Sequence, residues 1–65
     1  MKNEIYNILK KANRKMRVRE IANEMGILPI SITIFLRELE EENLVEGELI
    51  DDRGNEGVYW LWRAR

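Results

Sequence analysis

Side chains that could carry out covalent chemistry are scarce in this chain. It has no cysteine and no histidine, which removes thiolate nucleophiles, imidazole bases and the usual zinc ligands. A nucleophile–base pair would have to combine Ser31 or Thr33 with a lysine or a carboxylate, and nothing places such groups in one pocket. The glutamates between positions 38 and 42 follow the spacing of a helix face, and no glycine-rich phosphate loop is present. We therefore expect no enzymatic activity and no cofactor.

Positive and negative charges are separated along the sequence. Residues 1–37 carry eight basic and three acidic side chains, a balance of +5, whereas residues 38–65 carry three and nine, a balance of −6. Six basic residues fall close together: Lys10, Lys11, Arg14, Lys15, Arg17 and Arg19. Such a dipole can orient a molecule on an anionic partner even at a net charge of −1. The competing interpretation is that these charges belong to ordinary solvated helix faces.

Three amphipathic helices are predicted to position these groups. Apolar residues recur at i, i+3, i+4 and i+7, and the helices are expected over residues 3–13, 18–25 and 29–42. Asn3 is the expected N-cap of the first helix. Gly26 is expected to end the second in a left-handed conformation, Pro29 to begin the third, and Asn43 to cap its C-terminal end.

The C-terminal third of the chain is predicted to form a β-hairpin. Leu44–Ile50 and Val58–Arg63 are rich in aliphatic and aromatic residues, and Asp51–Gly57 between them contains two glycines. We also allow for a short third strand near Arg17. The expected fold class is α+β, mainly α, with residues 1–65 forming a single domain.

Three segments occur in an order and spacing that indicate a particular fold: VREIA at 18–22, LRELEEENLV at 36–45, and DDRG at 51–54 followed by VYWL at 58–61. They resemble the second helix, the end of the recognition helix and the wing of the winged helix-turn-helix superfamily of transcriptional regulators, nearest to its MarR-type members. The resemblance implies three helices followed by a two-stranded wing. It also implies binding to double-stranded DNA, with the third helix in the major groove.

The same resemblance implies which residues contact DNA. In the third helix, Ile32, Phe35, Leu36 and Leu39 are expected to face the core. The outward face then carries Ile30, Ser31, Thr33, Ile34 and Arg37. The hydroxyls and the guanidinium can reach base edges or phosphates, and the isoleucines can meet thymine methyl groups. Arg17 and Arg19 begin the second helix, where phosphate is favoured. Arg53 matches the wing arginine that enters the minor groove in the family.

Two features depart from the family pattern. Leu28 occupies the position before the third helix, where the family usually has a polar N-cap. The wing carries Asp51, Asp52 and Glu56 against the single Arg53, and carboxylates beside phosphates are repulsive. Arg53 therefore has an alternative role as a turn residue paired with Asp51 or Asp52.

A protein partner is the leading alternative to DNA. Ile30 and Ile34 are expected on the surface of the third helix, and Trp60 and Trp62 share one face of their strand. The family pattern directs the other face, which carries Tyr59, toward the core. The tryptophans would then be partly exposed and able to anchor a protein or a second copy of the chain, unless they cover the open edge of the core. In this alternative the chain is a winged-helix protein-interaction module that does not bind DNA.

The location of the protein is also indicated by its composition. No apolar run approaches the roughly 20 residues of a membrane span, and the first residues do not resemble a signal peptide. The absence of cysteine fits a reducing cytosol. We expect a soluble cytoplasmic protein without a membrane partner, standing alone or as the N-terminal module of a longer chain.

Overall fold

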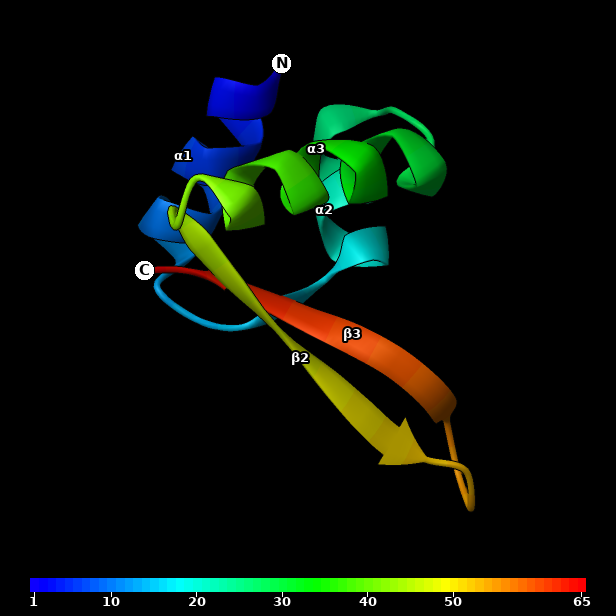
Figure 1. Cartoon of the computed structure of the whole chain (residues 1–65). Helices are drawn as coiled ribbons and strands as arrows, with labels where there is room; N and C mark the ends of the chain where they lie inside the picture. Colours follow the sequence, from blue (N-terminus) through cyan, green and yellow to red (C-terminus); the bar gives the residue numbers. More distant parts are fainter.

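The three helices lie together at one end of the molecule, and a long β-hairpin extends away from them (Figure 1). The structure is a computed structural model that describes all 65 residues. Its elements are α1 (Lys2–Ala12), β1 (Met16–Arg17), α2 (Val18–Met25), α3 (Pro29–Glu41), β2 (Val45–Asp52) and β3 (Gly57–Ala64). The strands form one antiparallel sheet in the order β1-β3-β2. This α+β arrangement is winged-helix-like, as predicted.

The helices end where residues adopt the left-handed conformation. Asn13 and Gly26 follow α1 and α2 with φ angles of 52° and 69°, and their N–H groups donate back to carbonyls of the preceding helix. Asn43, with a φ of 62°, follows α3 as predicted. None of the helices is long and apolar enough to cross a membrane.

The prediction that Asn3 caps α1 was wrong. Asn3 lies inside the helix, and the N-cap is Met1, whose side chain makes no capping hydrogen bond. The first turn is held instead by a tertiary contact: the Lys2 ammonium lies 2.5 Å from Glu42 and 3.6 Å from Glu38, at the end of α3. The hydrogen bond to Glu42 raises the pKa of Lys2 above its ordinary value. With this contact, α1 begins at Lys2, one residue before Asn3, whose side chain is better suited to an N-cap.

The hairpin is longer than predicted. β2 and β3 pair from Val45↔Ala64 to Asp52↔Gly57, so that the turn contains only residues 53–56 and both aspartates expected in the loop belong to β2. Gly57 has a φ of 89°, which a residue with a side chain rarely adopts. The predicted third strand is present as β1, which pairs with β3 through only two residues.

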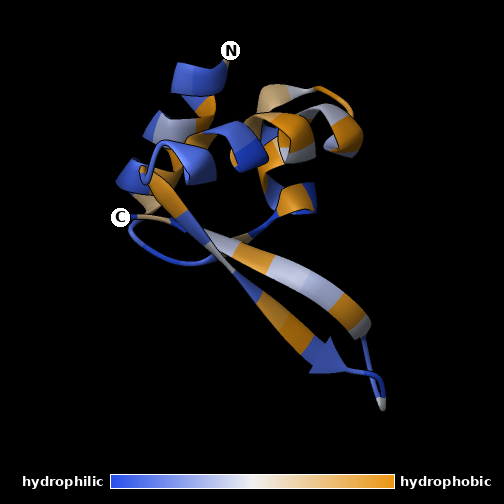
Figure 2. Ribbon diagram, viewed as in Figure 1, coloured by the Kyte–Doolittle hydropathy of each residue, from blue (hydrophilic) through white to orange (hydrophobic).

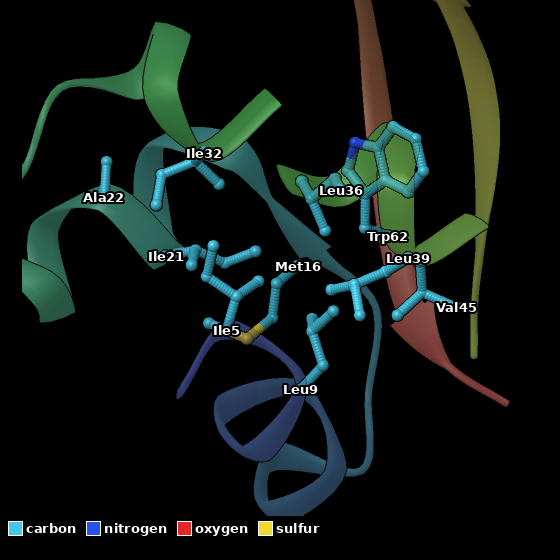
Figure 3. Close-up of a cluster of buried hydrophobic side chains, with 10 residues drawn as sticks. All are labelled: Ile5, Leu9, Met16, Ile21, Ala22, Ile32, Leu36, Leu39, Val45 and Trp62. Atoms are coloured by element: carbon cyan, nitrogen blue, oxygen red, sulfur yellow. The ribbon is translucent and has the colours of Figure 1, made fainter. Parts of the chain in front are cut away.

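Ten buried residues form one core that joins every helix to the sheet (Figure 3). They are Ile5, Leu9, Met16, Ile21, Ala22, Ile32, Leu36, Leu39, Val45 and Trp62. Every helix contributes at least two of them and every strand contributes one. No charged or polar residue is buried, so burial of apolar surface is the main force that holds the elements together.

Trp62 is buried, so the alternative in which the tryptophans cover the core holds for Trp62, and its predicted role as an exposed anchor for a partner was wrong. Trp62 is 4% exposed and Trp60 is 42% exposed, because their shared face is turned toward the helices but Trp60 lies farther out along the hairpin. The two rings stack with their centroids 5.7 Å apart. Trp62 therefore cannot anchor a partner, although Trp60 can. The buried indole N–H of Trp62 has no hydrogen-bond acceptor.

Gly47 explains why the tryptophan face is directed inward. It pairs with Trp62 across the hairpin, and a Cβ atom added at Gly47 would lie 2.7 Å from Cζ3 of the indole and 2.9 Å from two further ring atoms. Contacts this short are overpacked. The Trp62 ring thus occupies the space that a side chain at position 47 would fill.

Glu20 stabilises the start of α2. Its carboxylate accepts a hydrogen bond from the backbone N–H of Arg17 at 2.9 Å and another from the Arg14 guanidinium at 3.1 Å. This is the glutamate half of a capping box. The hydrogen bond from the Arg17 N–H, assisted by Arg14, lowers the pKa of Glu20 below its ordinary value.

We expect Gly47→Ala to lower the free energy of unfolding by about 1–3 kcal/mol, because the indole must move within a packed core. Urea denaturation followed by tryptophan fluorescence measures the change. Gly54→Ala is the matched control, since nothing lies within 4 Å of a Cβ at that turn position, and it should change stability by less than about 0.5 kcal/mol. Equal stability of the two variants would contradict the packing of Trp62 described above.

We expect Glu20→Ala to cost about 1 kcal/mol at neutral pH through loss of the capping hydrogen bond. A lowered folded-state pKa stabilises the fold above the unfolded-state value of about 4.3. The stabilisation is lost as the pH falls through the folded-state pKa, so the difference from the wild type should shrink in acid. Denaturation curves at neutral and acidic pH measure it. Glu24→Ala, on the same helix but without an ion pair, should show neither the cost nor its pH dependence.

Candidate nucleic-acid interface

The outward face of α3 carries exposed apolar side chains beside its polar ones. Ile30 and Ile34 are 68% and 56% exposed, and Leu28, just before the helix, is 70% exposed; we call these three residues the α3 patch. Figure 2 shows apolar residues along the turn between α2 and α3 and at the start of α3. Exposed aliphatic residues in one short segment are unusual for a surface without a partner.

The hydroxyl groups predicted to contact DNA differ in their availability. Ser31 is partly exposed and donates no side-chain hydrogen bond within the chain. The Thr33 hydroxyl donates to the carbonyl oxygen of Pro29, one turn earlier, at 3.2 Å. Thr33 therefore has its only donor engaged inside the helix, and the predicted role of Thr33 as a donor requires this bond to break.

Arg19 and Arg37 are the predicted contact residues whose cations are unpaired. Both are exposed, and neither makes an ion pair or a side-chain hydrogen bond within the chain. Arg19 lies in the first turn of α2, and Arg37 lies on α3, one turn beyond Ile34 on the same face. The two helices of the helix-turn-helix thus each present one free guanidinium group.

Arg17 is held by the wing. Its Nη1 lies 3.1 Å from Oε1 of Glu56, in the turn between β2 and β3, and its guanidinium carbon lies 3.8 Å from the centroid of the Tyr59 ring. The Arg17 side chain is 26% exposed. A cation predicted to contact phosphate is therefore already paired with a carboxylate and stacked on an aromatic ring. Glu56, which the sequence suggested only as a repulsive charge, has this second role.

Arg53 pairs with Asp51 through two parallel hydrogen bonds. Nε and Nη2 of Arg53 donate to the two carboxylate oxygens of Asp51, each at 2.8 Å. This is the turn-residue alternative considered for Arg53, although the side chain remains 78% exposed at the end of the wing. Asp52 makes no ion pair, so its charge stays uncompensated.

Folding compensates much of the charge separation along the sequence. Lys15 pairs with Glu48 of β2, Arg14 pairs with Glu20, and Lys2 pairs with the end of α3. In the basic cluster between residues 10 and 19, Arg14, Lys15 and Arg17 are thus each paired with a carboxylate. The field available to steer an anionic partner is weaker than the sequence predicts.

A second apolar surface lies on the wing and was missed in the sequence. Leu49 and Val58 are 53% and 54% exposed and lie on the same hairpin face as Trp60, because Leu49 pairs with Trp60 and Val58 is two residues before it. We call these three residues the wing patch. Side chains alternate between the two faces of a strand, so the wing patch can be identified from the sequence only once Trp62 is known to face the core. Trp60 also lines a hollow of about 180 Å³, together with Arg17, Val18, Arg19 and Tyr59.

Comparisons with known proteins provide no family for this chain. No protein-family model matches it, and no curated protein matches it either. The assignment of function therefore depends on the geometry of α3, the start of α2 and the wing.

Proposed function

We propose that the protein binds double-stranded DNA in transcriptional control, as its resemblance to winged helix-turn-helix regulators implies. In this proposal α3 enters the major groove and the wing lies at the minor groove or the backbone. The observation that carries the proposal is the placement of Arg19 and Arg37, the two unpaired arginines of the helix-turn-helix. In such motifs the second helix contacts bases while the first crosses the phosphate backbone.

Each arginine suits the contact that its helix makes. Arg37 follows Ile34 by one turn, so it can reach a guanine edge or a phosphate beside the surface that enters the groove. Arg19 lies in the first turn of α2, where the helix dipole also favours an anion. Ser31 can add a hydrogen bond to a phosphate or a base.

The remaining two arginines would contact DNA by exchanging partners. Arg17 would leave Glu56, and Arg53 would leave Asp51, when phosphate oxygens replace the carboxylates. Both ion pairs are exposed, and exposed pairs contribute about 0–1 kcal/mol each. The exchange is therefore inexpensive, but it reduces the net gain from each phosphate contact.

A second candidate function is docking of a protein, or of a second copy of the chain, without DNA. The observation that favours it is the α3 patch, whose three side chains are each more than half exposed. Apolar docking does not release counterions, so its affinity should change little with salt. Binding to DNA should fall steeply as salt rises. Salt dependence therefore distinguishes the two functions.

We expect Arg37→Ala and Arg19→Ala each to weaken binding to a mixed-sequence duplex by about three- to tenfold. Each loss should also reduce the slope of log affinity against log salt by about 1, as for a lost phosphate contact. Fluorescence anisotropy over a series of salt concentrations measures both quantities. Lys11→Ala removes an unpaired cation from α1, outside the helix-turn-helix, and serves as the matched control. Equal effects of all three substitutions would refute the proposed orientation.

We expect Glu56→Gln to raise the affinity for DNA by about three- to tenfold, because it frees Arg17 and also removes a wing carboxylate. Asp52→Asn makes the same change of charge on the wing without freeing an arginine, and it should raise affinity less. The difference between the two should disappear in an Arg17→Ala background, which a double-mutant cycle tests. If it persists there, Glu56 acts only through its charge and not through Arg17.

A further inference from the structure

The three aliphatic side chains of the α3 patch contribute nothing to a contact with DNA that is made through charge alone. Ile30 and Ile34 are one turn apart on one face of α3, and Leu28 precedes them at the N-cap. On the same face, Thr33 has its donor engaged by Pro29, which leaves Ser31 and Arg37 as the free hydrogen-bond donors. This surface therefore offers to base edges three exposed aliphatic side chains and only two free hydrogen-bond donors.

The major groove offers one kind of apolar group to such a surface. Its base edges present hydrogen-bond donors and acceptors, and the C5 methyl group of thymine is the single apolar feature. An aliphatic side chain placed against a donor or an acceptor displaces water without replacing its hydrogen bond, which is unfavourable. The same side chain against a methyl group buries apolar surface, which is favourable.

We propose that α3 recognises pyrimidine C5 methyl groups in the major groove through Ile30 and Ile34. The inference rests on the proposed DNA binding and names its ligand class as duplexes rich in thymine. A duplex whose cytosines carry a methyl group at the same carbon belongs to this class as well. Arg37 is unpaired and lies one turn beyond Ile34. A phosphate or a guanine would pair with its guanidinium, whereas an apolar protein partner would leave that charge without a partner.

Helix and groove dimensions match this arrangement. Side chains four residues apart on a helix are separated by about 5–6 Å, and successive base pairs rise about 3.4 Å along each strand. Ile30 and Ile34 therefore reach methyl groups on base pairs that are one or two steps apart. Burial of one methyl group corresponds to about a fourfold change in affinity, so two contacts give roughly tenfold or more.

The test compares two duplex pools that are identical except that deoxyuridine replaces thymidine in one of them. Base pairing and phosphate charge are the same, and only the C5 methyl groups are missing. We expect the wild type to bind the thymidine pool roughly tenfold more tightly at one salt concentration. Methylation of the cytosines in a G·C-rich duplex should likewise raise affinity, by about fourfold for each contact.

Variants separate direct contact from the shape of the DNA. Ile30→Ser with Ile34→Ser should abolish the preference for thymidine, and it should fold because both side chains are exposed, which circular dichroism checks. Leu49→Ser in the wing patch is the matched control and should keep the preference. A preference that survives in the double isoleucine variant would arise from DNA shape and would overturn the inference.

The remaining outcomes separate this inference from the proposed function. Salt-dependent binding with equal affinity for the two pools would overturn the recognition of methyl groups and leave DNA binding in place. Absence of binding to every duplex at low salt would overturn the proposed function and this inference together.

Discussion

The position of Trp62 against Gly47 is the constraint on which the exposed surface of the wing depends. Side chains alternate between the two faces of a hairpin, so one buried indole decides the orientation of every other residue in β2 and β3. Leu49 and Trp60 fall on the helix-facing side but beyond the helices, where they are exposed. Tyr59 falls on the opposite side, where Arg17, which pairs with Leu61, stacks its guanidinium on the Tyr59 ring. A slip of one residue would expose Trp62 and separate Arg17 from Tyr59.

Charge pairing determines how strongly this fold can attract an anion. The sheet and the end of α3 bring carboxylates against Arg17, Lys15 and Lys2, which are distant from them in sequence. The protein therefore has a nearly neutral surface with few free cations, and its sequence-independent affinity for DNA should be low. Low non-specific affinity favours discrimination, because the ratio of specific to non-specific binding decides which sites are occupied.

Local signals in the sequence predicted more than distant ones. Gly26, Pro29 and Asn43 identified the ends of α2 and α3 because each acts through its own backbone. The Arg53–Asp51 pair was considered because the two residues are near each other in sequence. The inward face of the hairpin was left between two alternatives, and the one that the family pattern favours was wrong. The choice depends on how Trp62 fits opposite Gly47, and only the register of two strands brings these residues together. The pairing of Arg17 with Glu56 spans 39 residues and was missed for the same reason.

The exposed isoleucines and the unpaired Arg37 are best understood as one surface. An isolated exposed aliphatic residue needs no explanation, but the α3 patch lies beside a guanidinium that makes no ion pair although Glu41 is one helical turn away. Burying that surface against an apolar protein would leave the charge of Arg37 without a partner, which is costly. Major-groove DNA provides an anionic backbone and base edges within reach of Arg37, together with methyl groups for Ile30 and Ile34. The combination of groups on α3 therefore supports the proposed binding of DNA over docking on a wholly apolar protein surface.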